Sequence, residues 1–372
     1  MKNFDEIFID KTKYGVKVQV AEYGERGKYV IIDQGQDQIA GYTNREEGLF
    51  KEVPVIIFGD HTRVIKYVDE PFFLGADGVK VLRSKDNNAN YKYLYYALKN
   101  AKIPNTGYNR HFKWLKEVCI KYPKREEQDM IVDILDNVSE IIYKRKDELS
   151  KLDNLIKARF IEMFGDAVVN PMNWPVKKLK DMSVQINSGN TPKGGSENYV
   201  EDGITFFRSQ NVWKDRLEMD DIAYIDAKTH ESMKRSSLKH GDILMTKTGR
   251  INTENSSLGR AALYMGEDDM ANVNGHVYFI RLKPEVNNKF VLRILVSPEY
   301  RDLIRRVCVG GIDKRQLNKE HIEDFPIICP PSDMVDEYVV FADQVNKSKV
   351  KVQKALDETQ KLFDSLMQQY FG

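Results

Sequence analysis

Cysteine is scarce in this sequence: Cys119, Cys308 and Cys329 are the only three among 372 residues, and none lies in a CxxC motif. An odd number of cysteines without metal-ligand spacing supports neither a disulfide framework nor a zinc ribbon. A reducing compartment fits this pattern best. The six histidines are scattered along the chain, so we also expect no metal site.

Long apolar runs are missing as well. No stretch approaches the roughly 18 apolar residues that a membrane-spanning helix needs. The first ten residues, MKNFDEIFID, carry acids where a signal peptide needs an apolar core. We therefore expect a soluble, cytoplasmic protein with no membrane partner.

The chain has no excess of charge of one sign. Its 57 basic and 56 acidic residues leave a formal net charge of +1. This balance neither favours nor excludes nucleic-acid binding, because acidic surface elsewhere can offset a basic face. With 41% hydrophobic residues, a chain of this length can bury two or three domain cores.

The sequence motifs of the common catalytic sites are not found. The single Gly-Lys pair, at 27–28, is followed by Tyr29 and not by the Ser or Thr of a P-loop. Residues 170–172, Asn-Pro-Met, only approach the Asn/Asp-Pro-Pro-aromatic segment of nucleic-acid methyltransferases. Asp221, Asp226 and Lys228 faintly resemble a nuclease cluster, but their spacing is too short and the segment is charge-rich. We predict no catalytic residue and no cofactor bound by this chain.

An internal repeat dominates the sequence. A shift of 207 residues lays 123–165 onto 330–372 without a gap and matches both the entry proline and the closing Phe-Gly. Apolar residues recur in alternating steps of four and three in both copies, which predicts coiled-coil helices of about 60 Å. One such helix alone would more often be bundle core, but the constant register of the repeated pair favours an intramolecular coiled coil. The predicted seam includes Ile131, Leu135, Val138, Ile142, Leu149, Leu152, Val345, Val352, Leu356, Phe363 and Leu366.

The segment before each predicted helix, 1–122 or 166–329, is rich in short β-like runs separated by turn residues. The chain thus reads as domain, helix (123–165), domain, helix (330–372). We predict an α+β fold. In it, two globular, β-rich domains are separated and joined by two long antiparallel coiled-coil helices in a pseudo-two-fold arrangement.

Side chains suited to reading DNA gather in the expected loops. Arg and Lys bind phosphates or guanine edges, and Asn or Gln pairs with adenine. Each residue taken singly more often satisfies a turn or belongs to a solvated face. The candidates are Gln34, Gln36, Gln38, His61, Thr62, Arg63, Asn109, Arg110, His111, Arg208, Ser209, Gln210, Asn211, Lys247, Thr248, Arg250, Lys314 and Arg315.

The second domain carries a family resemblance. Its segments NPMNWPVKKLKDM, INSGNTPKGG, ITFFRSQNV, LKHGDILMTKTG and ICPP are similar to the target recognition domains of the specificity (S) subunit of type I restriction-modification enzymes. PxxxxQ at 123–128 and the terminal LMQQYFG resemble the boundaries of that family's helical regions. Two departures are that residues 1–122 have no counterpart of Asn173-Trp174-Pro175, and that Val335 stands opposite Gln128.

The resemblance implies a non-catalytic subunit. Its two target recognition domains would each read one half of a bipartite, asymmetric sequence in the major groove of double-stranded DNA. Its helices would fix the spacer and dock two methyltransferase (M) subunits, and restriction (R) subunits would join the complex. S-adenosylmethionine, ATP and Mg²⁺ would be bound by those partner chains.

Two alternatives stay open at this point. A stand-alone nuclease, or a fragment of a fused restriction-modification enzyme, would cut DNA with Mg²⁺ and no partner. A structural coiled-coil adaptor would bind DNA no differently when Arg208, Lys247 and Arg250 are replaced.

Overall fold

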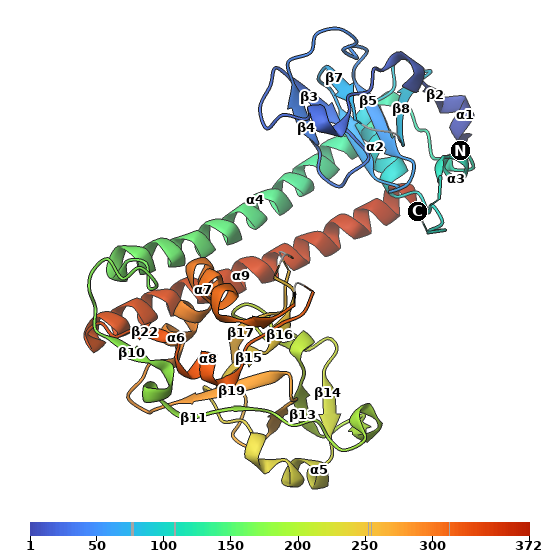
Figure 1. Ribbon diagram of the computed structural model, residues 1–372. Helices are drawn as coiled ribbons and strands as arrows, with labels where there is room; N and C mark the ends of the chain where they lie inside the picture. Colours follow the sequence, from blue (N-terminus) through green and yellow to red (C-terminus); the bar gives the residue numbers. More distant parts are fainter. Residues whose placement is uncertain (76–77, 108, 252, 254, 312) are drawn as a thin grey trace. The chain divides into compact units, whose positions relative to one another are not determined.

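The computed structural model describes residues 1–372 except 76–77, 108, 252, 254 and 312. The chain forms two compact units (Figure 1). Unit 1 consists of Met1–Leu149 and Val350–Gly372, and unit 2 of Ser150–Lys349. Both units combine helices with sheets, so the predicted α+β fold is confirmed.

Unit 1 contains two larger sheets and one short strand pair. The first sheet is antiparallel, in the order β2 (Phe8–Asp10), β8 (Val79–Ser84), β5 (Val55–Gly59), β6 (Ile65–Val68). The second has the order β4 (Gly41–Thr43), β3 (Tyr29–Ile32), β7 (Phe72–Leu74), with β3 and β7 parallel. The short pair joins β1 (Lys2–Asn3) to β9 (Cys119–Ile120). Three short helices complete the globule: α1 (Phe4–Ile7), α2 (Tyr91–Lys99) and α3 (Phe112–Leu115).

Unit 2 repeats this plan. Its first sheet has the order β11 (Ser183–Ser188), β19 (Val277–Leu282), β15 (Ile243–Thr246), β17 (Ala261–Leu263). In its second sheet β14 (Ala223–Ile225), β13 (Ile204–Phe207) and β18 (Ala271–Val273) follow one another, with β13 and β18 parallel. The pair of β10 (Val176–Lys178) and β22 (Pro326–Ile328) corresponds to β1 and β9. α6 (Asn288–Leu295) follows β19 as α2 follows β8.

Unit 2 is larger because it adds elements to the shared plan. An extra strand, β12 (Tyr199–Val200), extends the second sheet. A three-stranded sheet has the order β16 (Thr248–Gly249), β21 (Arg315–Gln316), β20 (Val309–Gly310). The added helices include α5 (Ala227–Ser232) and α7 (Pro298–Val307), whereas α8 (Lys319–Glu323) precedes β22 as α3 precedes β9. Much of the extra length of the second domain therefore forms these elements.

Two 40-residue helices, α4 (Arg125–Phe164) and α9 (Ser332–Phe371), each contribute one part to each unit. Acidic residues occupy the first turn of both, which complements the positive helix end. Gly165, at φ +72°, ends α4 in the left-handed conformation that glycine adopts most readily. In unit 2, Lys349 pairs with Asp153 at 2.5 Å and Glu337 with Arg159 at 2.7 Å, so the two helices run antiparallel.

The predicted seam residues lie on the inner faces of these helices. Ile131, Leu135, Val138 and Ile142 in α4 are buried, and in α9 so are the seam residues Val345, Leu356 and Phe363. The remaining ones, Leu149, Leu152, Val352 and Leu366, are half-buried. The seam is not apolar throughout, because it includes the buried Thr359, whose hydroxyl donates to the Ala355 carbonyl at 2.7 Å.

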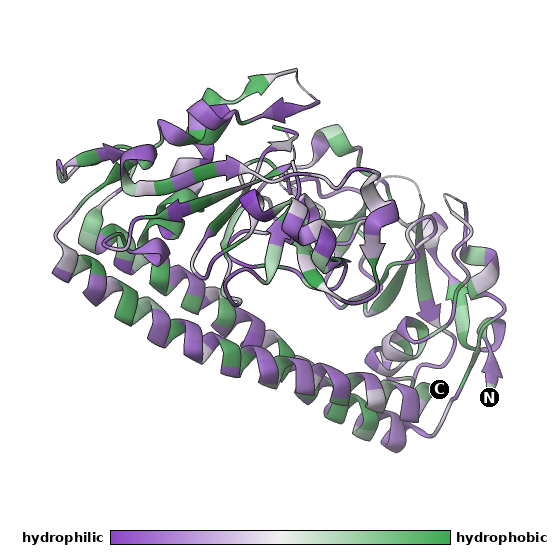
Figure 2. Ribbon diagram, turned by 90° about the horizontal axis from the view of Figure 1, so that it is seen from below, coloured by the Kyte–Doolittle hydropathy of each residue, from purple (hydrophilic) through white to green (hydrophobic). Residues whose placement is uncertain are grey.

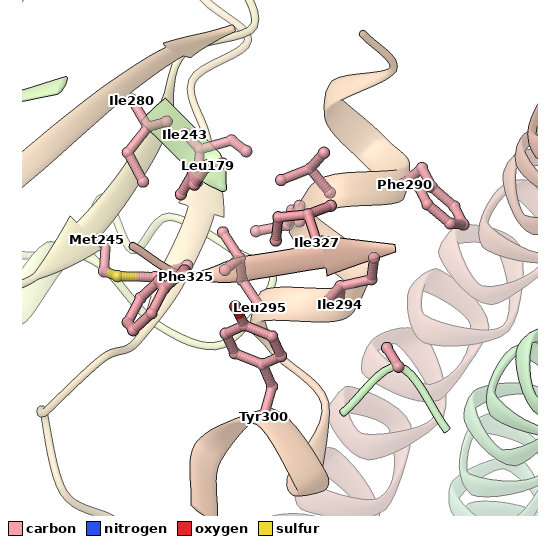
Figure 3. Packing of buried hydrophobic residues seen from close by; sticks show 14 of the residues in the cluster. Leu179, Ile243, Met245, Ile280, Phe290, Ile294, Leu295, Tyr300, Phe325 and Ile327 are labelled. Carbon is pink, nitrogen blue, oxygen red and sulfur yellow. The ribbon is translucent and has the colours of Figure 1, made fainter. Parts of the chain in front are cut away.

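In each unit, one hydrophobic core packs the globule against the parts of α4 and α9 that belong to that unit. In unit 2, Leu179, Ile243, Ile280, Phe290 and Ile327 belong to a cluster that also includes α4 and α9 residues (Figure 3). Unit 1 has the equivalent cluster around Phe4, Leu82 and Tyr93, with α4 and α9 residues again included. Green, hydrophobic segments concentrate in the strands, whereas the long helices alternate between green and purple (Figure 2). Among the described residues, no helix has the length and apolarity to span a membrane.

Candidate nucleic-acid interface

In unit 1, the polar candidates meet at a hollow beside the β5–β6 turn. Gln36, Gln38, Thr62 and Arg63 line this hollow of about 550 Å³, together with Lys99 of α2. Gln36, Gln38 and Thr62 are exposed, and Arg63 is half-buried. Segments about 30 residues apart in sequence thus present amide, hydroxyl and guanidinium groups on one surface, which is the chemistry that base edges require.

The turn itself is held by two of the other candidates. The Thr62 hydroxyl donates to the Gln34 carbonyl at 2.6 Å, and the His61 backbone N–H donates to Gln34 Oε1 at 3.2 Å. Arg63 adopts φ +62°, and its Nη1 donates to the Ile103 carbonyl at 3.3 Å. Gln34 and His61 are half-buried. They hold the turn in place and are less accessible to DNA than the exposed candidates.

His111 is the first correction. We predicted it as a DNA contact, but its side chain is fully buried. Its Nδ1 lies 3.0 Å from the Asp60 carbonyl and its Nε2 lies 3.3 Å from Thr106 Oγ1. A side chain held in this way orders the loop and does not reach DNA. The adjacent Asn109 and Arg110 are exposed and stay predictions.

Lys66 at the same hollow was missed by the sequence analysis. It is only 2% exposed, its Nζ donates to the Asp37 carbonyl at 2.5 Å, and it lies 3.6 Å from Asp33. Burial lowers its pKa, opposed by the Asp33 carboxylate. Strand alternation at IKYV was the available signal, since it places Lys66 on the face opposite Tyr67.

In unit 2, candidates from distant segments meet on the three-stranded sheet. Thr248 pairs with Gln316 and Gly249 with Arg315, which joins the 247–250 and 314–315 segments. Thr248, Arg250 and Lys314 line a hollow of about 320 Å³. Arg250 and Lys314 are exposed, so two cations border one concave surface.

Lys247 and Arg315 lie deeper at this sheet. Both are half-buried. The Lys247 ammonium sits 5.6 Å from the centre of the Tyr278 ring, and Arg315 Nη1 donates to the Cys308 carbonyl at 3.5 Å. Arg315 Nε is buried without a hydrogen-bond partner among the described residues. Buried guanidinium groups usually find acceptors, so Arg315 Nε, like Arg208 Nε, could donate to a new partner.

The segment 208–211 is the second correction. Asn211 is 1% exposed, its Oδ1 accepts from the Arg208 N–H at 3.0 Å, and its Nδ2 donates to the Asp221 carbonyl at 2.9 Å. Its assignment as a DNA contact is wrong, because it closes this turn. The Arg208 guanidinium and the Gln210 amide both bind the Asp221 carboxylate, at 3.1 Å each. Their hydrogen bonds lower the pKa of Asp221; Ser209 is half-buried.

Arg260 was not predicted from the sequence, although it holds the backbone of Asn255 and Ser256. It is 8% exposed, and its Nε donates to the Ser256 carbonyl at 3.0 Å. Its guanidinium also donates to the Asn255 carbonyl and stacks on the Trp213 ring, 3.8 Å from the ring centre. Nothing in the local sequence pattern indicates this role, because it depends on loops about 45 residues apart.

Across the part of the chain that the structure describes, no three His, Cys, Asp or Glu side chains form a group that could hold a metal ion.

The comparison with protein families finds a similarity in the first part of the chain. Residues 2–151 match the family described as "Type I restriction modification DNA specificity domain". The specificity subunit of the type I restriction enzyme EcoR124I/EcoR124II of Escherichia coli is 30% identical over 152 residues. That alignment covers 37% of this chain and 37% of that relative, so it spans little more than a third of either protein. The predicted resemblance to type I specificity subunits is confirmed.

Solved structures show the same fold over the whole chain. The S subunit of a type I restriction-modification system from M. genitalium gives a TM-score of 0.61 at 16% identity and covers 100% of this chain and 95% of that chain. A chain from a study of complex assembly and conformational transition of the type I R-M system gives 0.52 at 14% identity. Here the shares are 100% and 99%. At such identities the likeness concerns the fold alone.

Proposed function

We propose that this chain is the DNA sequence-specificity subunit of a type I restriction-modification complex. The specificity-domain match of residues 2–151 carries the proposal, and the repeated strand order of unit 2 supports a second reader built on the same plan. Because the two globules differ strongly in sequence, we propose that each reads a different half of a bipartite, asymmetric target.

The exposed polar groups supply the reading chemistry. Gln36 and Gln38 in unit 1 are suited to adenine, which an amide pairs with bidentately in the major groove. Arg250 in unit 2 is suited to guanine, and Lys314 to a guanine edge or a phosphate. A good bidentate pair contributes about 1–3 kcal/mol of discrimination against a wrong base, so a few such contacts suffice for a specific site.

The long helices are the proposed docking surface for the partner chains. Several large apolar side chains on their outer faces are exposed, as expected for an interaction surface. We propose that they bind two methyltransferase subunits, and that restriction subunits join through the assembled complex. Catalysis, with S-adenosylmethionine, ATP and Mg²⁺, would then lie on those chains. The exposed side chains are Met130, Ile141, Tyr143, Leu155, Ile161, Val340, Val350 and Leu362.

Co-expression tests the proposal. The full chain is produced with the methyltransferase subunit encoded beside it, and the methylated positions of the host genome are mapped. We expect a stable complex and one bipartite motif with a fixed spacer. A continuous motif, or no complex, would contradict the assignment.

The two alternatives are tested on the same preparation. The isolated chain should leave DNA uncut in the presence of Mg²⁺, whereas a nuclease would cut it. Replacing Arg250 and Lys314 by alanine should weaken DNA binding, whereas an adaptor would be unaffected.

A further inference from the structure

A second concave surface in unit 2 is strongly charged. It encloses about 680 Å³ between α4, α6, α7 and the 213–216 loop. The side chains that line it come from five segments that the fold brings together, the fifth being α9, which contributes Lys349. They are Asp153, Lys157, Lys214, Asp215, Arg216, Arg293, Val296, Pro298, Arg301, Asp302, Arg305 and Lys349.

Basic residues outnumber acidic ones in this lining by seven to three. Two of the acids are engaged: Asp153 with Lys349 at 2.5 Å, and Asp302 with Arg305 at 3.0 Å. Among the described residues, Lys157 and Arg293 form no ion pair within 4.0 Å. The cleft therefore keeps a positive charge that its own carboxylates do not balance.

Like charges also crowd at one wall. The buried Arg260 interacts electrostatically with Arg301 and Arg216, which line the cleft, and its hydrogen bonds go to backbone carbonyls and not to a carboxylate. Burial lowers its pKa, and the charges of Arg301 and Arg216 lower it further. An anion in the cleft would offset this repulsion, because a nearby negative charge stabilises the charged form of a guanidinium.

The amino end of α7 faces the same space. Ser297 caps this ten-residue helix by accepting from the Tyr300 N–H at 3.2 Å, and Pro298, its first residue, lines the cleft. The positive end of a helix dipole favours phosphate. It adds to the side-chain charges of Arg301 and Arg305, one and two turns further along.

We infer that this cleft binds the phosphodiester backbone of the DNA duplex, independently of sequence; the inference rests on the proposed function. Only Val296 and Pro298 among the twelve lining residues are apolar and none is aromatic, so base stacking and an apolar protein contact are both poorly served. Arg301 Nη2 also donates to the Thr253 carbonyl at 3.5 Å. Thr253 lines the hollow of Arg250 and Lys314, so the cleft adjoins the proposed base-reading surface.

Unit 1 has different residues at the equivalent positions. The 207-residue shift places Asp364 opposite Lys157, and Ile142 opposite Lys349. Alignment of α2 with α6 on their capping residues, Asn90 and Asn287, places Tyr96 opposite Arg293. The backbone contact is thus a property of unit 2 alone.

Salt-dependent binding tests the inference. The full chain and the double variant Lys157→Gln, Arg293→Gln are titrated with two labelled 30-base-pair duplexes of unrelated sequence over a range of salt concentrations. Two lost phosphate contacts should lower the slope of log K against log salt by about 1.8 and weaken binding more than tenfold at 0.1 M salt, equally for both duplexes. Lys228→Gln in α5 removes one exposed charge outside the cleft and should leave the slope unchanged, as should the charge-preserving Arg293→Lys.

An unchanged slope for the double variant overturns the inference, and so does a loss confined to one duplex. Retained DNA binding with lost co-purification of the methyltransferase subunit also overturns it, because the cleft would then hold protein. The proposed function fails separately, if the wild-type chain with its methyltransferase subunit produces no bipartite motif. Circular dichroism establishes that each variant is folded.

Discussion

In both units a Lys–Asp ion pair joins the globule to a long helix, and we call this ion pair the joint. The side chains around the joint differ between the two units. In unit 1, Lys92 of α2 binds Asp136 of α4 at 2.5 Å; in unit 2, Lys289 of α6 binds Asp343 of α9 at 2.6 Å. Asp136 and Asp343 are exact equivalents under the 207-residue shift. A duplicated chain has thus kept the attachment of globule to helix, while the exposed loops have diverged. This is the division expected when the joint serves structure and the loops serve recognition.

The neighbours of this joint are not equivalent. The Tyr96 hydroxyl in unit 1 donates to Asp136 at 2.7 Å and lies 3.3 Å from Ser139. Arg293 replaces Tyr96 in unit 2, and with Tyr338 it lines a hollow of about 350 Å³. A polar network therefore fills unit 1 where unit 2 is open.

The largest expected effect on the free energy of unfolding comes from the single phenylalanine that ends each long helix, Phe164 in α4 and Phe371 in α9. Phe164 is fully buried and meets Phe290 with ring centres 5.0 Å apart, whereas its equivalent Phe371 is half-buried against Tyr93. Phe164→Ala should lower the free energy of unfolding by about 3–5 kcal/mol, and Phe371→Ala by roughly half of that. Urea unfolding of the full chain measures both. Equal losses would show that the two ends are packed alike.

Gln128 and Val335 give the next effect. Gln128, 2% exposed, accepts from the Asn90 N–H at 2.9 Å and donates to the Pro123 carbonyl at 2.9 Å, whereas Val335 contributes to the apolar core of unit 2. Gln128→Leu leaves two partly buried backbone groups, the Asn90 N–H and the Pro123 carbonyl, unpaired and should cost about 1–3 kcal/mol. Val335→Ile should cost under about 1.5 kcal/mol. The two losses are compared by thermal unfolding, and a harmless Gln128→Leu would contradict a structural role for these two hydrogen bonds.

The tyrosine hydroxyls should respond in opposite directions. Tyr96→Phe removes the bond to Asp136 and should destabilise the chain by about 1 kcal/mol. Tyr338 is 2% exposed, and its hydroxyl has no hydrogen-bond partner among the described residues. Tyr338→Phe should therefore be neutral or stabilising by up to about 1 kcal/mol. Calorimetry on the two variants decides, and a loss at Tyr338 as large as at Tyr96 would reveal a partner for that hydroxyl.

The smallest expected effect is a pH dependence of the folding stability of unit 1. Hydrogen bonds from Asn90 and Arg125 lower the pKa of Asp129, and the Asn88 N–H and the Tyr122 hydroxyl lower the pKa of Asp86. A lowered carboxyl pKa stabilises the folded state above the unfolded value of about 3.9, and this stabilisation is lost as the pH falls through the folded value.

Trp114 reports on unit 1 when Trp174 and Trp213 are replaced by phenylalanine. Its fluorescence should show acid unfolding below about pH 4. Asp129→Asn, whose side chain no longer titrates, should make this transition less steep. If the acid unfolding transition is identical with and without the Asp129 carboxylate, that carboxylate does not contribute to the pH dependence of folding stability.

Structural features that follow from a local pattern were predictable from the sequence. The seam of α4 and α9 was predictable because its period repeats over forty residues, and the Pro and Gly at the ends mark the helix boundaries. The exposure of single side chains was not predictable where it depends on contacts with distant segments. His111 and Asn211 look like surface loop residues, but Asp60 and Glu218 supply the carbonyls that their buried side chains satisfy. The meeting of Thr248 with Gln316 likewise depends on sheet pairing over 68 residues, which no local pattern encodes.

The central claim is that each unit reads its own half of one target. Methylated motifs are mapped for the co-expressed complex with Gln36→Ala, Gln38→Ala in unit 1, and separately with Arg250→Ala, Lys314→Ala in unit 2. We expect each variant to relax the base requirement of one half only, a different half in each case, with the spacer unchanged. A variant that altered both halves, or two variants that altered the same half, would contradict the claim.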